Sequence, residues 1–91
     1  MDNFEWDPQK ARANWLKHDV SFSDAVAALE DEQALTIEDD HPHEQRFITL
    51  GCDAFGRLLV VVYTYRSDTI RIISARKATP GEMKVYQEGE S

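Results

Sequence analysis

Residues 70–77 read Ile-Arg-Ile-Ile-Ser-Ala-Arg-Lys, and this stretch decides the fold of the chain. Its β-branched residues are typical of a strand that buries itself in a sheet. Cations interrupt that pattern, because Arg71 lies inside the strand and Arg76 and Lys77 end it. Burying an unpaired guanidinium costs several kcal/mol. Either acidic partners therefore lie across the sheet, or one sheet face is open and positively charged, and the second alternative predicts an anion-binding surface.

Period-two alternation of apolar residues continues upstream of this strand. Turn-forming residues at Asp53–Gly56 and Arg66–Asp68 separate the alternating segments. Residues 34–37 are a shorter candidate for an additional strand. The pattern predicts an antiparallel meander, with strands at residues 47–50, 58–65 and 70–75.

The N-terminal part of the chain begins with a short strand signal, because Phe4 and Trp6 alternate with a polar residue. Asp7-Pro8 follows and combines an N-cap carboxylate with proline at the first helical position. This arrangement predicts a helix over residues 8–18.

Two further helices are indicated by capping boxes, in which a hydroxyl residue is followed three positions later by an acidic one. The first box is Ser21–Asp24, and an apolar stripe with helical spacing runs from Phe22 to Leu29. The second is Thr79–Glu82, which predicts a last helix ending near residue 88.

The order of these elements predicts a small α+β two-layer sandwich. Helices grouped before an antiparallel sheet are expected to cover one face and leave the other partly open. Since side chains alternate along a strand, Arg71 and Lys77 are expected to share one face of the last strand. Arg76 ends the strand, where twist is expected to bring it toward the same groove.

The 91 residues predict one domain over residues 1–91, with a net charge of −7 that is unevenly distributed. Residues 1–45 hold 3 basic and 12 acidic side chains, whereas residues 46–91 hold 7 basic and 5 acidic ones. The C-terminal half is therefore the part suited to anions. The acidic half is either solvated surface or a footprint for a basic partner protein.

Cys52 is the single cysteine, which excludes an internal disulfide and a cysteine-based zinc site and fits a reducing compartment. The chain has no basic and apolar leader and no run of about 18 apolar residues, so we expect a cytoplasmic protein without a membrane span. No Gly-rich phosphate loop, Ser-His-Asp order or zinc spacing is present, and no cofactor is expected.

The run Glu38–Glu44 reads Glu-Asp-Asp-His-Pro-His-Glu and is predicted to be an acidic, solvated loop. Carboxylates and imidazoles at this spacing are also preferred by divalent ions, which makes a metal site the alternative. Pro42 bends the run, and no regular element is expected to orient the two histidines. No metal site is therefore predicted.

A resemblance to a known family rests on residues spread along nearly the whole chain, from Phe4 to Tyr86. With them the chain resembles the BrnT family, the toxins of bacterial type II toxin-antitoxin pairs. Asp19 is a departure, since the family often has glycine there, and it puts the end of the first helix in question. The residues that carry the resemblance are Trp6-Asp7, Asn14, Lys17-His18, Phe22, Glu44, Arg46, Gly51, Val60–Tyr63, Arg71–Arg76, Ala78, Glu82 and Tyr86.

The resemblance implies a compact RelE-like fold and a metal-independent ribonuclease that stops translation. It also implies neutralisation by a BrnA-type antitoxin with a ribbon-helix-helix DNA-binding domain, and hence a hetero-oligomer with that antitoxin.

Metal-free RNA cleavage requires a proton to leave the 2′-hydroxyl, charge on the phosphorane to be neutralised and the 5′-oxygen to gain a proton. Arginine suits the second task, because its guanidinium is planar, bidentate and always charged. Arg46, Arg71 and Arg76 are the predicted phosphate ligands. Tyr86 is predicted to stack on a base or donate a proton.

His18 completes the predicted catalytic set, and Arg66 and Lys77 are predicted to contact RNA. Each candidate also has a structural explanation. The dipole of the first helix favours a cation at its C-terminus, which accounts for His18 without catalysis. Arg46 can form a surface ion pair with the nearby Glu44, and Arg71 can pair with a carboxylate across the strand. Tyr86 can pack the last helix against the sheet.

Two classes of function remain open, a toxin ribonuclease and a non-catalytic module that holds an acidic partner or nucleic acid on the same basic face. The chain has no helix-turn-helix or ribbon-helix-helix pattern and is net negative. It is therefore not expected to bind operator DNA alone.

Overall fold

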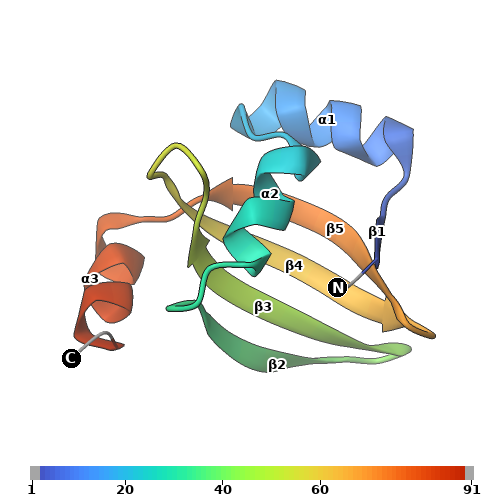
Figure 1. Ribbon diagram of the computed structural model, residues 1–91. Coiled ribbons are helices and arrows are strands. Elements are labelled where there is room, and N and C mark those ends of the chain that lie inside the picture. The colour runs from blue at the N-terminus through green and yellow to red at the C-terminus, as the bar shows by residue number, and fades with distance from the viewer. Residues whose placement is uncertain (1–2, 90–91) are drawn as a thin grey trace.

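The computed structural model describes residues 3–89, which form a five-stranded sheet and three helices (Figure 1). The elements in chain order are β1 (Asn3–Glu5), α1 (Pro8–His18), α2 (Phe22–Leu29), β2 (Leu35–His41), β3 (Glu44–Cys52), β4 (Leu58–Arg66), β5 (Thr69–Lys77) and α3 (Pro80–Gly89). The sheet order is β1-β5-β4-β3-β2. Strands β2 to β5 form an antiparallel meander, and β1 joins β5 in parallel. The α+β prediction is confirmed.

The first two helices begin and end where the sequence predicts. The Asp7 carboxylate accepts a hydrogen bond from the Gln9 amide at 2.8 Å, and the Ser21 hydroxyl accepts one from the Asp24 amide at 3.0 Å. Asp19 adopts the left-handed backbone conformation, with φ at 57°, and ends α1. Aspartate therefore terminates this helix in the conformation for which glycine is the usual residue.

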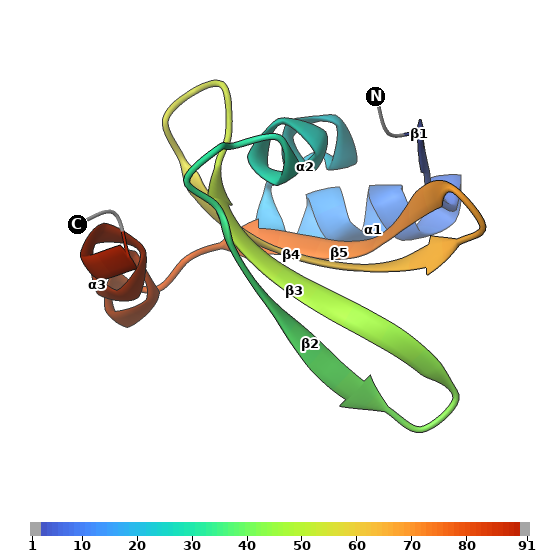
Figure 2. The same cartoon turned by 60° about the horizontal axis from the view of Figure 1, so that its bottom comes forward.

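The hydrophobic core lies between the sheet and the two N-terminal helices, which cover the same face (Figure 2). Trp6 packs against this core and meets Phe22 edge to face, with ring centroids 5.9 Å apart. Trp15 is 49% exposed on α1 and does not belong to the core. The buried core residues are Val20, Phe22, Ala25, Ala28, Leu59, Val61, Tyr63, Ile70, Ile72 and Ala75.

Asn14 of α1 replaces a neighbouring strand at the edge of β5. Pairing with β1 reaches only Arg71, so the later part of β5 lacks a strand on that side. The buried Asn14 side chain accepts from the Ala75 amide at 3.0 Å and donates to the Ala75 carbonyl at 2.8 Å. These bonds satisfy backbone groups that burial would otherwise leave unpaired.

The prediction of an acidic loop over Glu38–Glu44 is wrong for most of its length. Strand β2 continues to His41 and β3 begins at Glu44, so two residues form the turn. The hairpin register pairs Asp39 with Arg46, which gives an acidic side chain a basic neighbour across the strands. β2 is also an edge strand, where charged side chains discourage pairing with another chain.

Strand β5 contains a bulge at its centre. Its register pairs Ser74 with Val62 but Ile72 with Tyr63, so Ile73 is an extra residue on β5. An extra residue reverses the alternation of side chains beyond it.

The bulge corrects the predicted placement of the cations. Ile72 and Ala75 both point into the core, although they are three residues apart. Arg71 and Arg76 consequently share the opposite face, whereas Lys77 points to the helix-covered side. The expectation that Arg71 and Lys77 share a face is therefore wrong.

Candidate functional site

The sheet face turned away from α1 and α2, here called the open face, carries the predicted arginines of the strands. Thr64 lies opposite Arg71 on β5, and the β3–β4 register continued by one residue places Arg46 on the other side of Thr64. Arg66 lies two residues further along β4 and so on the same face. Arg76 lies towards the other end of β5. The fold thus groups Arg46, Arg66 and Arg71 around Thr64, with Arg76 farther away.

Arg46 and Arg71 each have a carboxylate partner, as their structural explanations predict. Arg46 Nε donates to Glu44 Oε1 at 2.8 Å, and Arg71 Nη1 donates to Glu5 Oε2 at 3.2 Å. The two arginine side chains are 27% and 26% exposed. Partly exposed ion pairs contribute little to stability, so an incoming anion can compete for both guanidinium groups.

His41 is a candidate that the sequence does not predict, because the run Glu38–Glu44 reads as an acidic loop. Strand β2 places His41 opposite Glu44 on the open face. The hydrogen bond from Arg46 lowers the pKa of Glu44, and the positive charges of Arg66 and His41 lower it further. The open face therefore carries an imidazole and an ionised carboxylate beside its arginines. In the sequence, the two residues between His41 and Glu44 are the feature that could have predicted a hairpin with these two side chains opposite each other.

Arg76 forms a bidentate ion pair with Glu82 of α3. Its two Nη atoms donate to the two carboxylate oxygens at 2.8 and 2.9 Å. Glu82 also accepts from the Thr79 amide at 2.8 Å, and the Thr79 hydroxyl accepts from the Glu82 amide at 3.2 Å, which confirms the second capping box. The hydrogen bonds from Arg76 and Thr79 lower the pKa of Glu82 from 4.5 to about 2. Arg76 thus fixes the start of α3.

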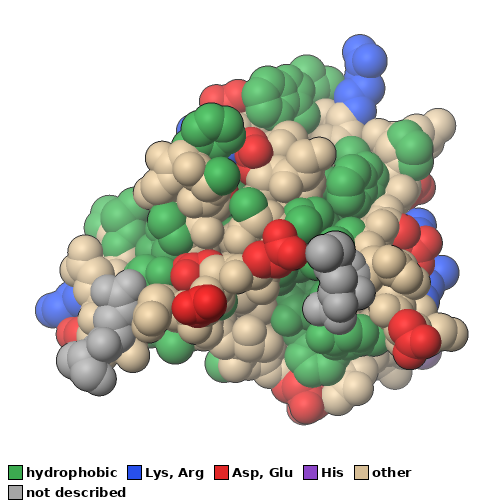
Figure 3. Space-filling view, in the orientation of Figure 1, with side chains coloured by type: hydrophobic (Ala, Val, Ile, Leu, Met, Phe, Trp, Pro, Cys, Tyr) green, Lys and Arg blue, Asp and Glu red, His purple; other side chains and the backbone are tan. Residues whose placement is uncertain are grey.

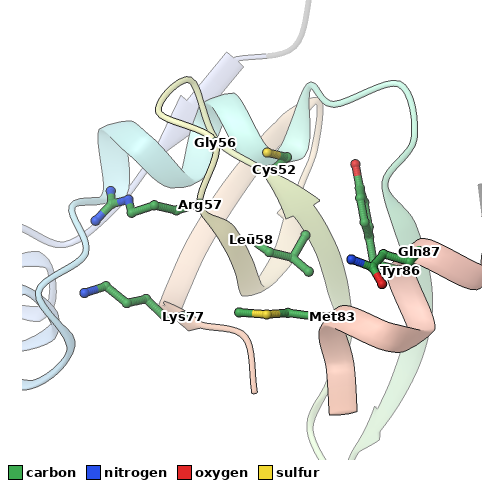
Figure 4. Close-up of a pocket in the computed structure, with 8 residues that line it drawn as sticks. All are labelled: Cys52, Gly56, Arg57, Leu58, Lys77, Met83, Tyr86 and Gln87. Atoms are coloured by element: carbon green, nitrogen blue, oxygen red, sulfur yellow. The ribbon is translucent and has the colours of Figure 1, made fainter. Parts of the chain in front are cut away.

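A pocket of about 440 Å³ lies between α3 and the turn that joins β3 to β4. Figure 4 shows Arg57 and Lys77 along one side and Tyr86 with Gln87 on the other. The pocket brings together two predicted residues, Lys77 and Tyr86, and separates them from the arginines around Thr64. The lining residues are Cys52, Gly56, Arg57, Leu58, Lys77, Met83, Tyr86 and Gln87.

Arg57 was also missed, and the fold holds it as a fixed cation. Its Nε donates to Asp53 and its Nη2 to Asp24, both at 2.8 Å, and its Nη1 donates to the Asp19 carbonyl at 3.3 Å. The hydrogen bond to the fully buried Asp53 side chain raises the pKa of Arg57. These contacts join the β3–β4 turn to α1 and α2. In the sequence, this fixed position of Arg57 is indicated only by the four-residue spacing of Asp53 and Arg57 across a predicted turn.

The Tyr86 hydroxyl donates to Asp31 Oδ2 at 2.5 Å and ties α3 to the segment that follows α2. Burial raises the pKa of Asp31, but hydrogen bonds from Tyr86 and from the Cys52 and Gln33 amides outweigh burial and lower it. The hydroxyl is therefore engaged within the protein, and the ring of Tyr86 lines the pocket.

His18 lies at the last position of α1, beside Asp19. The Asp19 carboxylate is 3.7 Å from Lys77 Nζ, and its carbonyl accepts from Arg57. His18 is consequently at the pocket end of the molecule, and the fold does not bring it to the arginines around Thr64.

Among the charged side chains on the side of the molecule seen in Figure 3, acidic ones outnumber basic ones. Within residues 3–89, His, Cys, Asp and Glu side chains do not gather in groups of three that could hold a metal ion. None of the helices described is long and apolar enough to span a membrane.

Comparisons with known proteins identify the family of the chain and a solved structure of similar fold. The family model described as "Ribonuclease toxin, BrnT, of type II toxin-antitoxin system" matches residues 6–82. The crystal structure of the Brucella abortus ribonuclease toxin BrnT has a similar fold, with a TM-score of 0.65 and 20% sequence identity over 87% of this chain and 99% of that one. No curated protein sequence matches the chain. The family match spans most of the chain and every arginine of the open face, and the chain therefore belongs to the BrnT family of ribonuclease toxins of type II toxin-antitoxin systems.

Proposed function

We propose that this toxin cleaves RNA without a metal ion and holds the scissile phosphate on the open face. The observation that carries this proposal is the group of Arg46, Arg66 and Arg71 around Thr64, on a sheet face that α1 and α2 leave uncovered. Guanidinium groups neutralise developing phosphorane charge in the way that a metal ion otherwise does. The weak ion pairs of Arg46 and Arg71 leave both able to exchange a carboxylate for a phosphate.

In the proposed reaction, the 2′-oxygen attacks the adjacent phosphorus and the bond to the 5′-oxygen breaks, which leaves a 2′,3′-cyclic phosphate. Arg46 and Arg71 bind the non-bridging oxygens. Glu44 takes the proton of the 2′-hydroxyl, and the His41 side chain donates a proton to the leaving 5′-oxygen. Both groups lie on the same face as the arginines.

The remaining predicted residues have other positions in this proposal. Arg66 and Arg76 extend the positive charge of the open face along β4 and β5 and bind neighbouring phosphates. Lys77, Tyr86 and His18 lie at the pocket end and take no part in the chemical step.

Cleavage by the purified chain in the presence of EDTA tests the reaction. We expect Arg46→Ala and Arg71→Ala to reduce the cleavage rate by roughly 10²-fold or more, the scale seen when one donor to a transition-state oxyanion is removed. Arg12→Ala is the matched control, since Arg12 is exposed on α1, away from the open face, and should retain full activity. Loss of activity in EDTA, or full activity in both open-face variants, would contradict the proposal.

Cleavage of mRNA would arrest translation, and a BrnA-type antitoxin with a ribbon-helix-helix domain would neutralise the toxin by covering the open face. An acidic antitoxin segment suits the arginines there. Arginine-selective chemical modification tests this arrangement, because Arg46 and Arg71 should be protected in the complex. Equal modification of these arginines in the free and bound toxin would refute it.

A further inference from the structure

The pocket beside α3 has the size and lining of a site for a small ligand. Its volume of about 440 Å³ falls within the range of about 300–1,000 Å³ that is typical of such sites. Leu58 and Met83 give it an apolar wall, and Tyr86 adds an aromatic ring (Figure 4). Flat rings stack on tyrosine and pack well against a thioether. The lining is therefore suited to a planar ring.

The charges around the pocket favour an uncharged ring over a phosphate. Arg57 is bound to the carboxylates of Asp53 and Asp24, and Lys77 lies 3.7 Å from that of Asp19. Two carboxylates thus offset Arg57, whereas Lys77 is 52% exposed and has one distant carboxylate beside it. The polar groups left for a ligand are hydrogen-bonding groups at the rim, chiefly the Gln87 amide, which both donates and accepts.

The end of β5 connects the pocket to the open face. Arg76 and Lys77 are consecutive, and the first points to the open face while the second lines the pocket. α3 borders both regions, because Glu82 binds Arg76 and Met83 lines the pocket. An RNA strand with a phosphate at Arg76 can therefore direct an adjacent base around the end of the sheet.

We infer that this pocket binds one unpaired nucleobase of the RNA and sets the base preference of cleavage. The inference rests on the proposed ribonuclease function and names a second site for the same substrate. A nucleobase combines a flat ring with an edge of donors and acceptors, which is the combination that the apolar lining and the Gln87 amide recognise. An apolar side chain of the antitoxin is the competing occupant.

Binding of free nucleosides tests the pocket apart from catalysis. In amide NMR spectra of the full chain, we expect one of the four uncharged nucleosides to shift Lys77, Tyr86 and Gln87. Met83 is 41% exposed, so Met83→Trp can fill the pocket without disturbing the core, and it should abolish these shifts. Val85→Trp is the matched control, because Val85 is 55% exposed on the other flank of α3. Absence of shifts with all four nucleosides would overturn the inference.

Cleavage of a randomised single-stranded RNA gives the second readout. The wild-type chain should prefer one base at a fixed distance from the cut, and Met83→Trp and Gln87→Leu should lower that preference by about tenfold or more. Val85→Trp should keep it. Unchanged base preference in Met83→Trp would refute the inference.

The two proposals fail in different ways. Nucleoside binding by a chain that cuts no RNA would remove the ribonuclease proposal and leave the pocket assigned to a base. Metal-free cutting without nucleoside binding would remove the pocket assignment alone. Shifts of the pocket amides by the antitoxin, and by none of the nucleosides, would assign the pocket to the partner and overturn the inference.

Discussion

The arginines of this toxin differ in how firmly the fold holds them, and the difference separates the two arginines proposed for the chemical step from Arg57 and Arg76. All three nitrogens of Arg57 donate within the protein, including one to the buried Asp53. Arg76 is held by both oxygens of Glu82. Arg46 and Arg71, by contrast, each donate one hydrogen bond to a glutamate side chain. These last two are the arginines that can most easily exchange their partner for a phosphate.

Glu82 should make stability depend on pH. Its pKa in the folded chain is about 2, below the ordinary 4.5, so its ionised form contributes stability above about pH 4.5 and this contribution is lost as the pH falls towards 2. The ion pair is partly exposed and screened, with side-chain exposures of 42% for Arg76 and 32% for Glu82. We expect Glu82→Gln to lower the free energy of unfolding at pH 7 by about 1 kcal/mol.

Urea denaturation at pH 7 and pH 2 checks this expectation. The difference in stability between wild type and Glu82→Gln should be clearly smaller at pH 2, where about half of Glu82 is protonated. Glu32→Gln is the control, because Glu32 is exposed and should leave stability unchanged at both values. An equal loss of stability at pH 7 and pH 2 would show that the charge of Glu82 is not the cause.

At the scale of elements, close packing and the bulge in β5 position the functional groups. α2 packs directly on β3 at Gly51, where a Cβ atom would lie 2.2 Å from the Ala28 carbonyl oxygen. The bulge at Ile73 turns Arg71 and Arg76 to the open face while Ile72 stays in the core. The packing of α2 on the helix-covered face therefore depends on Gly51, and the placement of Arg71 and Arg76 on the open face depends on the bulge at Ile73.

Gly51→Ala should destabilise the fold by roughly 3 kcal/mol, because the added methyl group forces the α2 backbone away from β3. Gly81→Ala is a matched control in α3, where the nearest atom lies 4.0 Å from an added Cβ. Its effect should stay within about 1 kcal/mol and favour the helix. Thermal and urea denaturation of the two variants measure the difference, and similar stabilities would contradict the close approach.

Deletion of Ile73 should abolish cooperative folding. Without the extra residue, one half of β5 has to turn over, and either Ile70 and Ile72 or Ala75 leave the core. Ile73→Val keeps the bulge and should cost about 1 kcal/mol. Circular dichroism and urea denaturation distinguish the two variants. A deletion variant that unfolds cooperatively near the wild-type midpoint would show that the register tolerates the shift.

At the scale of the whole molecule, four arginines share the open face of a protein with a net charge of −7, and three of them are paired with a carboxylate. Attraction of RNA to the arginines works against repulsion by the acidic N-terminal half, so nonspecific binding of nucleic acid should be weak and sensitive to salt.

The toxin alone should not bind the operator, but it should tighten binding by the antitoxin. Its net charge of −7 opposes contact with the DNA backbone, and bridging two antitoxin dimers would raise their effective concentration on DNA. Gel shifts with toxin, antitoxin and both proteins measure this. A sequence-specific shift by the toxin alone, or an antitoxin affinity that the toxin leaves unchanged, would contradict the expectation.

The sequence by itself determined the helices, the meander and the family, since these depend on local signals. Asp7, Ser21 and Thr79 cap their helices through bonds that span two or three residues, which can be read directly from the chain. Turn residues likewise marked the boundary between β3 and β4. The arginines of the open face could therefore be named as candidates before their positions were known.

Only the tertiary structure decided which candidates meet. One extra residue in β5 reverses the faces of its cations, and alternation along a strand cannot reveal a bulge that depends on the register with β4. The acidic run became a strand because β3 lies beside it, which brought His41 to the arginines. The pocket joins residues between Cys52 and Gln87, and it exists only because contacts distant in sequence, such as that of Tyr86 with Asp31, dock α3 beyond the end of the sheet.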